Sequence, residues 1–330
     1  VRVAATKSDL SDRLPDTSLR ITEFVAIVCL RDSSDGIYTF ENVLTLSCQT
    51  LSIMSLLLTL FVYAALPSLR TVPGRCVMCM CVALLVAQVL FQWGSNANLI
   101  RPLCITVAVL DHWAWLAYFC WMIILAYDIY SHMTGDTLAD EELHNRQFRC
   151  YLLLGWGSPS IIVTACLIIS SVSPNRFSYA DGKVCWISTS TGMISLLLAV
   201  VVPLAIALIL NTTFFISTMI AIRQAVKTIQ RQIDAANSRV QLYVYMRLAS
   251  LMGFTWILGL LANALPYPGM RYAFIICNSL QGVVIMTAFV CKKRIMRKLK
   301  NKFSAERVDS SRSTIVSKVN SAHIVKSRAD

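Results

Sequence analysis

The sequence predicts an all-α membrane protein, a bundle of seven transmembrane helices with its N-terminus outside the cell. Hydrophobic residues make up 56% of the chain and charged residues only 15%, whereas about 25% of a soluble domain is charged. The hydrophobic residues gather in long blocks, each near the roughly 20 residues that cross a bilayer as a helix. Lys and Arg concentrate in alternate connections between the blocks, and this bias sets the orientation.

The seven hydrophobic blocks are residues 43–66, 76–93, 104–130, 150–173, 193–222, 242–264 and 272–291. We interpret each block as a helix, because only helices satisfy their own backbone hydrogen bonds in lipid at this length. The second block is short and the third contains Asp111 and His112. A false span in the second block would make the count even and would place both chain ends on one side.

The orientation follows from the Lys and Arg residues of the short connections. With the N-terminus outside, the inner connections contain 15 Lys and Arg residues and the outer connections contain 4. The inner connections are 67–75, 131–149, 223–241 and the start of the tail, 292–302. Because cytoplasmic loops carry the excess of Lys and Arg, we expect the C-terminus inside the cell.

Four segments are expected along the chain. Residues 1–42 form an extracellular segment, which we interpret as the remnant of an ectodomain because the chain begins at Val1 without a secretory signal. The seven-helix domain covers 43–291. Residues 292–303 place Ile295, Met296, Leu299 and Phe303 at helical spacing among cations, which predicts an amphipathic eighth helix on the inner leaflet. A disordered basic flank is the alternative. The Ser-rich residues 304–330 are expected to be a disordered cytoplasmic tail.

The charge distribution points to membrane lipid as a partner and excludes nucleic acid. The net charge of the chain is +12, and residues 292–330 carry +9 of it. Because this basic stretch directly follows a hydrophobic span, anionic headgroups are its natural counter-charge.

The sequence contains no carrier of enzymatic chemistry or cofactor binding. The motifs HExxH, GxSxG and GxxxxGK[ST] are absent. Cys76, Cys79 and Cys81 lack further metal ligands nearby, so we expect packing, or lipidation of Cys76, instead of a metal site. A transporter or channel is the alternative function, but it would show internal repeats or interrupted helix pairs, and we find no self-similar halves.

Ionisable residues inside the predicted spans are functional candidates. Asp111 and His112 lie in the outer third of the third span, where they either line a cavity or bond to neighbouring helices. Asp128 and Arg247 lie near the inner ends of the third and sixth spans. They either pair and hold these ends together, or extend separately toward the headgroups.

Hinges and a disulfide are the remaining candidates. Gly253 and Gly259 flank Trp256 in the sixth block, and Pro203 lies in the fifth, where such residues permit a bend or serve close helix packing. Cys104 and Cys185 both lie on the predicted outer side, which is oxidising. They are therefore expected to form a disulfide, with two unpaired thiols as the alternative.

Motifs in six regions together resemble the secretin/adhesion class of G-protein-coupled receptors, and most closely its Methuselah-like branch. They are LRxxxGRCxxC at 69–79, CWMIILAYDIY at 120–130, FxxY and WGxP at 148–159, CW at 185–186, MGFTW at 252–256 and NSLQG at 278–282. The resemblance covers residues 38–302. One departure is Leu125-Ala126, where secretin-type receptors usually carry Glu-Gly.

The resemblance implies a plasma-membrane receptor that transmits an extracellular peptide or adhesion-type signal to a heterotrimeric G protein, and that is not an enzyme. It implies a family disulfide between Cys104 and Cys185 and a bend of the seventh helix at Gln281 and Gly282. It also implies a docking surface for arrestin on the Ser-rich tail. The residues expected on the ligand side are Trp186, Asp111, His112 and Trp115. Those expected on the G-protein side are Asp128, Arg223, Lys227, Arg231, Arg239 and Arg247.

Overall fold

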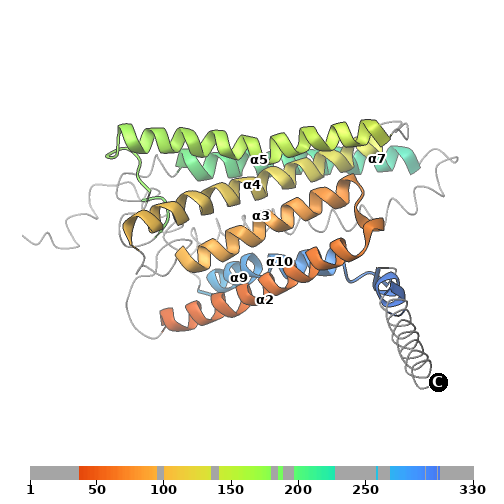
Figure 1. Ribbon diagram of the computed structural model, residues 1–330, viewed down its shortest axis with the longest axis horizontal. Helices are drawn as coiled ribbons and strands as arrows, with labels where there is room; N and C mark the ends of the chain where they lie inside the picture. Colours follow the sequence, from red (N-terminus) through yellow and green to blue (C-terminus); the bar gives the residue numbers. More distant parts are fainter. Residues whose placement is uncertain are drawn as a thin grey trace, which may run out of the picture.

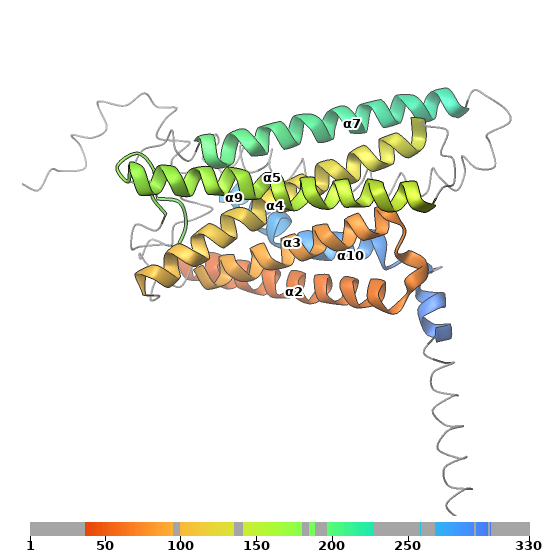
Figure 2. The same cartoon turned by 45° about the horizontal axis from the view of Figure 1, so that its top comes forward.

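The protein is a bundle of long helices in its computed structural model (Figures 1 and 2). The structure describes residues 37–94, 100–134, 141–179, 185–188, 197–226, 258, 268–293, 295–302 and 304. Its helices are α2 (Ile37–Ala65), η1 (Pro67–Leu69), α3 (Val72–Gly94), α4 (Arg101–Thr134), α5 (Glu141–Val172), η2 (Leu197–Val201), α7 (Val202–Val226), α9 (Pro268–Ser279) and α10 (Gln281–Phe289).

Five helical stretches are long and apolar enough to cross a membrane: Phe40–Ala65, Val72–Gln92, Arg101–His132, Glu142–Val172 and Leu197–Ala221. Among the described residues, the pair α9 and α10, bent by 48° at Leu280, passes the same test when its two helices are taken together as one span. These six match the predicted first to fifth and seventh blocks. The predicted sixth block, 242–264, lies outside the described residues, as do residues 1–36 and most of the tail.

The helices are longer than the hydrophobic blocks, so the predicted ends need correction. α5 begins at Glu141, although its block begins at residue 150, and α3 begins at Val72 instead of residue 76. The hydrophobic pattern marks only the part of a helix that faces lipid. Glu141–Arg149 continues the helix on polar residues with good helix propensity. Much of the predicted second inner connection, 131–149, is therefore helical.

α4 is the central helix of the described bundle, packing against α3, α5 and α7, while α9 and α10 pack against α2. Figures 1 and 2 show α4 running obliquely from beside α3 toward α7, and Figure 2 shows α5 crossing it. The core that this arrangement buries includes Leu56, Met80, Tyr118 and Trp121. Large apolar side chains on the outside of the bundle, such as Ile161, are exposed to the space that lipid would occupy.

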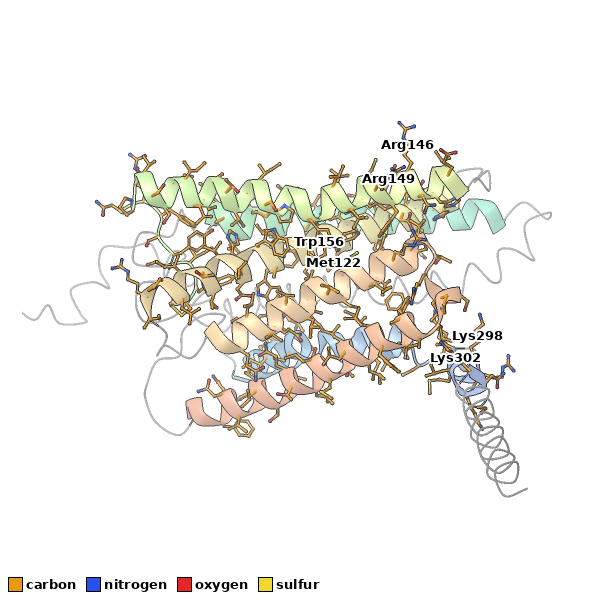
Figure 3. All side chains as sticks on the ribbon, viewed as in Figure 1. Met122, Arg146, Arg149, Trp156, Lys298 and Lys302 are labelled. Atoms are coloured by element: carbon orange, nitrogen blue, oxygen red, sulfur yellow. A yellow bond between two sulfur atoms is a disulfide. The ribbon has the colours of Figure 1, made fainter. Side chains whose placement is uncertain are left out.

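Residues 295–302 are helical and rest on the end of α2. Ile295 is buried with Val62, Leu66 and Val290, and Leu299 packs against this cluster. The Lys298 ammonium donates to the Ser68 hydroxyl at 3.2 Å, and the Lys302 ammonium donates to the Ala65 carbonyl at 2.6 Å. Figure 3 shows both lysines at the end of the bundle near which Arg146 and Arg149 lie on α5.

Candidate functional site

The connection between α5 and α7 carries a short β-like pairing that a disulfide fastens to α4. Tyr179 and Ile187 form an antiparallel bridge, and the N–H of Ser188 donates to the Ser178 carbonyl at 2.8 Å. Cys185 is bonded to Cys104 in the first turns of α4. We call residues 177–179 and 185–188 the loop pair. Its position over the bundle is therefore fixed by both covalent and hydrogen bonds.

His112 lies directly below the loop pair and contacts three parts of the chain. Its Nδ1 is 3.0 Å from the Tyr179 hydroxyl, and its Nε2 is 3.0 Å from the Ala199 carbonyl oxygen. A carbonyl only accepts, so Nε2 carries the proton, and Nδ1 of the neutral ring accepts from the tyrosine. Burial raises the pKa of Tyr179, which keeps its hydroxyl protonated as the donor.

Aromatic rings close the space around this histidine. The Trp186 ring stands edge-on to the imidazole at a centroid distance of 6.3 Å, and Phe177 stands edge-on to Tyr179 at 5.0 Å. All of these side chains are buried. We call His112, Phe177, Tyr179 and Trp186 the outer cluster. It joins α4, the loop pair and the beginning of the α7 span.

Asp111, the neighbour of His112, is also buried and makes different contacts. The Trp115 indole N–H donates to its carboxyl group, while its Oδ1 has no hydrogen-bond partner within the described part of the chain. Trp115 itself packs edge-on against Tyr118. Asp111 and His112 therefore do not act as one polar pair, because each side chain has its own partners.

A second set of polar contacts surrounds the break between α9 and α10. The Tyr118 hydroxyl donates to Gln281 Oε1 at 3.4 Å, and Gln281 Nε2 donates to Asn278 Oδ1 at 3.1 Å. The N–H of Gly282 donates to the Ser52 hydroxyl at 2.8 Å. These contacts tie the break to both α2 and α4, at the two residues that the resemblance places at a bend.

Asp128 is fully buried near the other end of α4. Its Oδ1 accepts from the Tyr151 hydroxyl of α5 at 3.2 Å and lies 3.7 Å from His132 Nε2. The rings of His132 and His144 stack at 6.1 Å. An extension toward the headgroups does not fit a side chain with no exposed surface. The partner that the sequence suggested, Arg247, lies outside the described residues.

Tryptophans join α4 to α5 in the middle of the bundle. The Trp121 ring stands edge-on to Trp156 at 5.7 Å, and Trp156 stacks on Trp113 at 5.2 Å. Figure 3 shows Trp156 beside Met122 at this contact. A Cβ atom on Gly155 would lie 2.5 Å from the Trp121 ring. Glycine at this position is therefore what lets the two helices approach.

The remaining sequence candidates are placed only in part. Gly253, Trp256, Gly259, Lys227, Arg231 and Arg239 lie outside the described residues. Arg223 belongs to α7, and its side chain is not described. Cys76 is completely buried among the described helices, which favours packing over lipidation at this position. Pro203 is the second residue of α7 and lies two residues after Val201, the last residue of the π-helical turn η2.

The sequence did not predict four of the residues that contact the candidate side chains: Tyr179, Ala199, Ser52 and Tyr151. Ser52 and Gly282 are 230 residues apart in the chain, and His112 and Ala199 are 87 apart. No local pattern signals such contacts. One signal was available, because Pro203 has no N–H for the carbonyl four residues earlier, which is that of Ala199.

Known proteins resemble this chain over the whole described bundle. The family model for seven-transmembrane receptors of the secretin family matches residues 38–285. The G-protein coupled receptor Mth2 of Drosophila yakuba is 23% identical over 331 residues, covering 89% of this chain and 60% of that protein. The G-protein coupled receptor Mth of the same species is 26% identical over 275 residues, covering 77% and 52%.

The human Adhesion G-protein coupled receptor G2 is 29% identical over 264 residues. This match covers 75% of the chain and 25% of the human protein. The chain thus spans 60% or less of each of these three relatives.

Proposed function

Because the chain belongs to the secretin family of seven-transmembrane receptors, we propose that it transmits an extracellular, peptide or adhesion-type signal to heterotrimeric G proteins. The observation that carries this proposal is the match over residues 38–285, which includes the five long apolar helical stretches and most of the bent pair α9 and α10. The chain is a multi-pass plasma-membrane protein and a receptor, not an enzyme.

In this proposal the chain crosses the membrane seven times, with the loop pair outside and the α2–α3 connection inside. The distribution of cations supports this orientation. Arg70, Arg75, Lys298 and Lys302 gather where α2 ends and α3 begins, close to the predicted inner face. The one proposed crossing that the described helices do not include is the predicted sixth span, 242–264. The charge bias of inner loops favours this side as cytoplasmic.

We assign ligand recognition to the outer end and G-protein recognition to the inner end. Trp186 belongs to the loop pair and meets His112 on α4, and Asp111 and Trp115 lie on the same part of α4. An extracellular ligand or ectodomain would act at this end. The sixth helix would bend at Gly253, Trp256 and Gly259, and α7 at Pro203. The cations Arg223, Lys227, Arg231, Arg239 and Arg247, with Asp128, would then face the G protein. A ligand drives this change only by binding one conformation more tightly.

Two further partners belong to this proposal. Residues 295–302 expose Met296 and several cations beside the bundle, a composition suited to an anionic inner leaflet. The Ser-rich residues after 304 would dock arrestin once phosphorylation has added negative charge.

Nucleotide exchange on purified G proteins tests the proposal. The full chain in lipid nanodiscs is mixed with each Gα class and Gβγ, and binding of GTPγS is followed. A receptor without ligand still populates its active state at about 0.1–10%. We therefore expect GTPγS binding to one Gα class to be about twofold faster with the chain than with empty nanodiscs. Arg231→Glu should abolish the increase, whereas Arg176→Glu at the opposite end should not. No increase with any class, from a folded chain, overturns the proposal.

A further inference from the structure

The loop pair does not rest on the bundle only through its disulfide. Tyr179 and Trp186 are 3% and 7% exposed, although both belong to a connecting segment. Connecting segments usually run over the surface. Here their side chains reach into the bundle and meet His112, whose ring is 1% exposed. The loop pair therefore has a specific polar contact below it that the disulfide does not require.

The other side of His112 faces a carbonyl that has lost its usual α-helical donor. In an α-helix the Ala199 carbonyl would accept from the N–H of residue 203. That residue is Pro203, which has none. The turn Leu197–Val201 is π-helical, a rare form that often marks functional positions. His112 Nε2 supplies the missing donor at 3.0 Å.

We propose that His112 is a positioning residue that couples the loop pair to the π-helical turn Leu197–Val201. The tyrosine hydroxyl holds the ring in the orientation that aims Nε2 at Ala199. When the loop pair moves away, Nδ1 loses its donor and the imidazole is free to turn. The Ala199 carbonyl then loses its side-chain partner, and the turn that begins the α7 span loosens.

This inference stands on geometry alone and does not need the chain to activate a G protein. Its consequence for signalling does rest on the proposed function. A ligand that displaces the loop pair would change the first turns of the α7 span through one side chain. The inner end of that helix carries Arg223, on the proposed G-protein side.

The alternative is that His112 merely fills space between α4 and α7. The two ideas differ in what the removal of one distant hydroxyl does. Tyr179→Phe keeps the ring that packs on Phe177 but removes the donor to Nδ1. Coupling predicts faster amide exchange at Leu197–Val201, although Tyr179 lies outside that turn. Simple packing predicts an effect within the loop pair only.

Hydrogen exchange of the full chain in nanodiscs, read by mass spectrometry, separates them. Tyr179→Phe should speed exchange at residues 197–202 by roughly five- to tenfold, as expected for loss of one hydrogen bond. Tyr127→Phe, on the far part of α4, is the matched control and should leave these amides unchanged. If residues 197–202 of Tyr179→Phe exchange at the wild-type rate and only residues 177–188 exchange faster, the proposed coupling is wrong.

Variants of the histidine itself give an independent test. His112→Gln keeps an N–H near Nε2, whereas His112→Phe keeps only bulk. Exchange at 197–202 should be near wild type in His112→Gln and several-fold faster in His112→Phe. Pro203→Ala adds a backbone N–H four residues after Ala199. His112→Phe should therefore lower the thermal midpoint less in a Pro203→Ala background than in the wild-type background. Equal cost in both backgrounds would contradict a bond that replaces the missing N–H. Retention of the Cys104–Cys185 disulfide verifies that each variant is folded.

Discussion

The backbone N–H of Gly282 donates to the Ser52 hydroxyl at 2.8 Å, across the contact of α10 with α2. This bond satisfies an amide beside the 48° break at Leu280. The same approach leaves no room for a side chain. A Cβ atom on Gly282 would lie 2.5 Å from both the carbonyl and the hydroxyl oxygen of Ser52.

Gly282→Ala should therefore destabilise the bundle by about 1–3 kcal/mol, because the backbone of α2 would have to move. The measurement is the thermal midpoint of the purified protein. Gly269→Ala in α9 is the matched control, since no neighbouring atom lies within 4 Å of its added Cβ. Alanine there should be neutral or stabilising through helix propensity. Equal shifts for the two variants would disprove the close approach of α10 to α2.

Gly155 and Gly157 in α5 form a second matched pair. A Cβ on Gly155 would meet the Trp121 ring at 2.5 Å, whereas one on Gly157 meets nothing within 4 Å. Trp121 is fully buried against Trp156 and Phe148 and has little freedom to retreat. Gly155→Ala should cost about 1–3 kcal/mol and alter tryptophan fluorescence, while Gly157→Ala should change neither. A tolerated Gly155→Ala would show that α4 and α5 are farther apart.

Tyr151→Phe should weaken the inner end of the α4–α5 contact. The substitution removes the hydroxyl that donates to Asp128, whose Oδ2 already has no partner within the described residues. Leaving a buried carboxyl short of a donor costs about 1–3 kcal/mol. Tyr127→Phe, which keeps its ring contact with Phe214, is the control for thermal unfolding. If both variants unfold alike, the Tyr151–Asp128 bond contributes nothing to stability.

Ile295→Ala should release the helical residues 295–302 from the bundle. Ile295 is buried against Leu66 and Val290, whereas Met296 is 49% exposed. Removing buried methyl groups costs up to about 2–5 kcal/mol, enough to favour local opening. Trypsin should then cleave faster at Lys298 and Lys300 in Ile295→Ala than in Met296→Ala. Identical cleavage rates would mean that this segment is held by lipid alone.

The architecture follows from the sequence to the extent that lipid contact dictates it. Hydrophobic blocks located the five long apolar helices and the bent pair α9 and α10, because a span must be apolar over its full thickness. Helix ends were misjudged where polar residues continue a helix beyond the bilayer, as at Glu141. The bend at Gln281 and Gly282 came from family resemblance, since neither residue breaks a helix by its propensity alone.

The contacts of the candidate site were less accessible from the sequence. Cys104 and Cys185 were paired because both were predicted on the outer, oxidising side, and the structure contains this disulfide. The partners of His112 could not be derived, since Tyr179 and Ala199 reach it only once α4, α5 and α7 have packed. Asp128 was singled out as an ionisable residue in a predicted span, but its contact with Tyr151 depends on how α5 rotates against α4.

The most direct test of the seven crossings is the sidedness of the two chain ends. One epitope tag is placed before Val1 and another after Asp330, and antibodies are applied to intact and permeabilised cells expressing the full chain. Seven crossings predict that the first tag is detected on intact cells and the second only after permeabilisation. Detection of both tags on intact cells, or of neither until permeabilisation, would contradict the receptor topology.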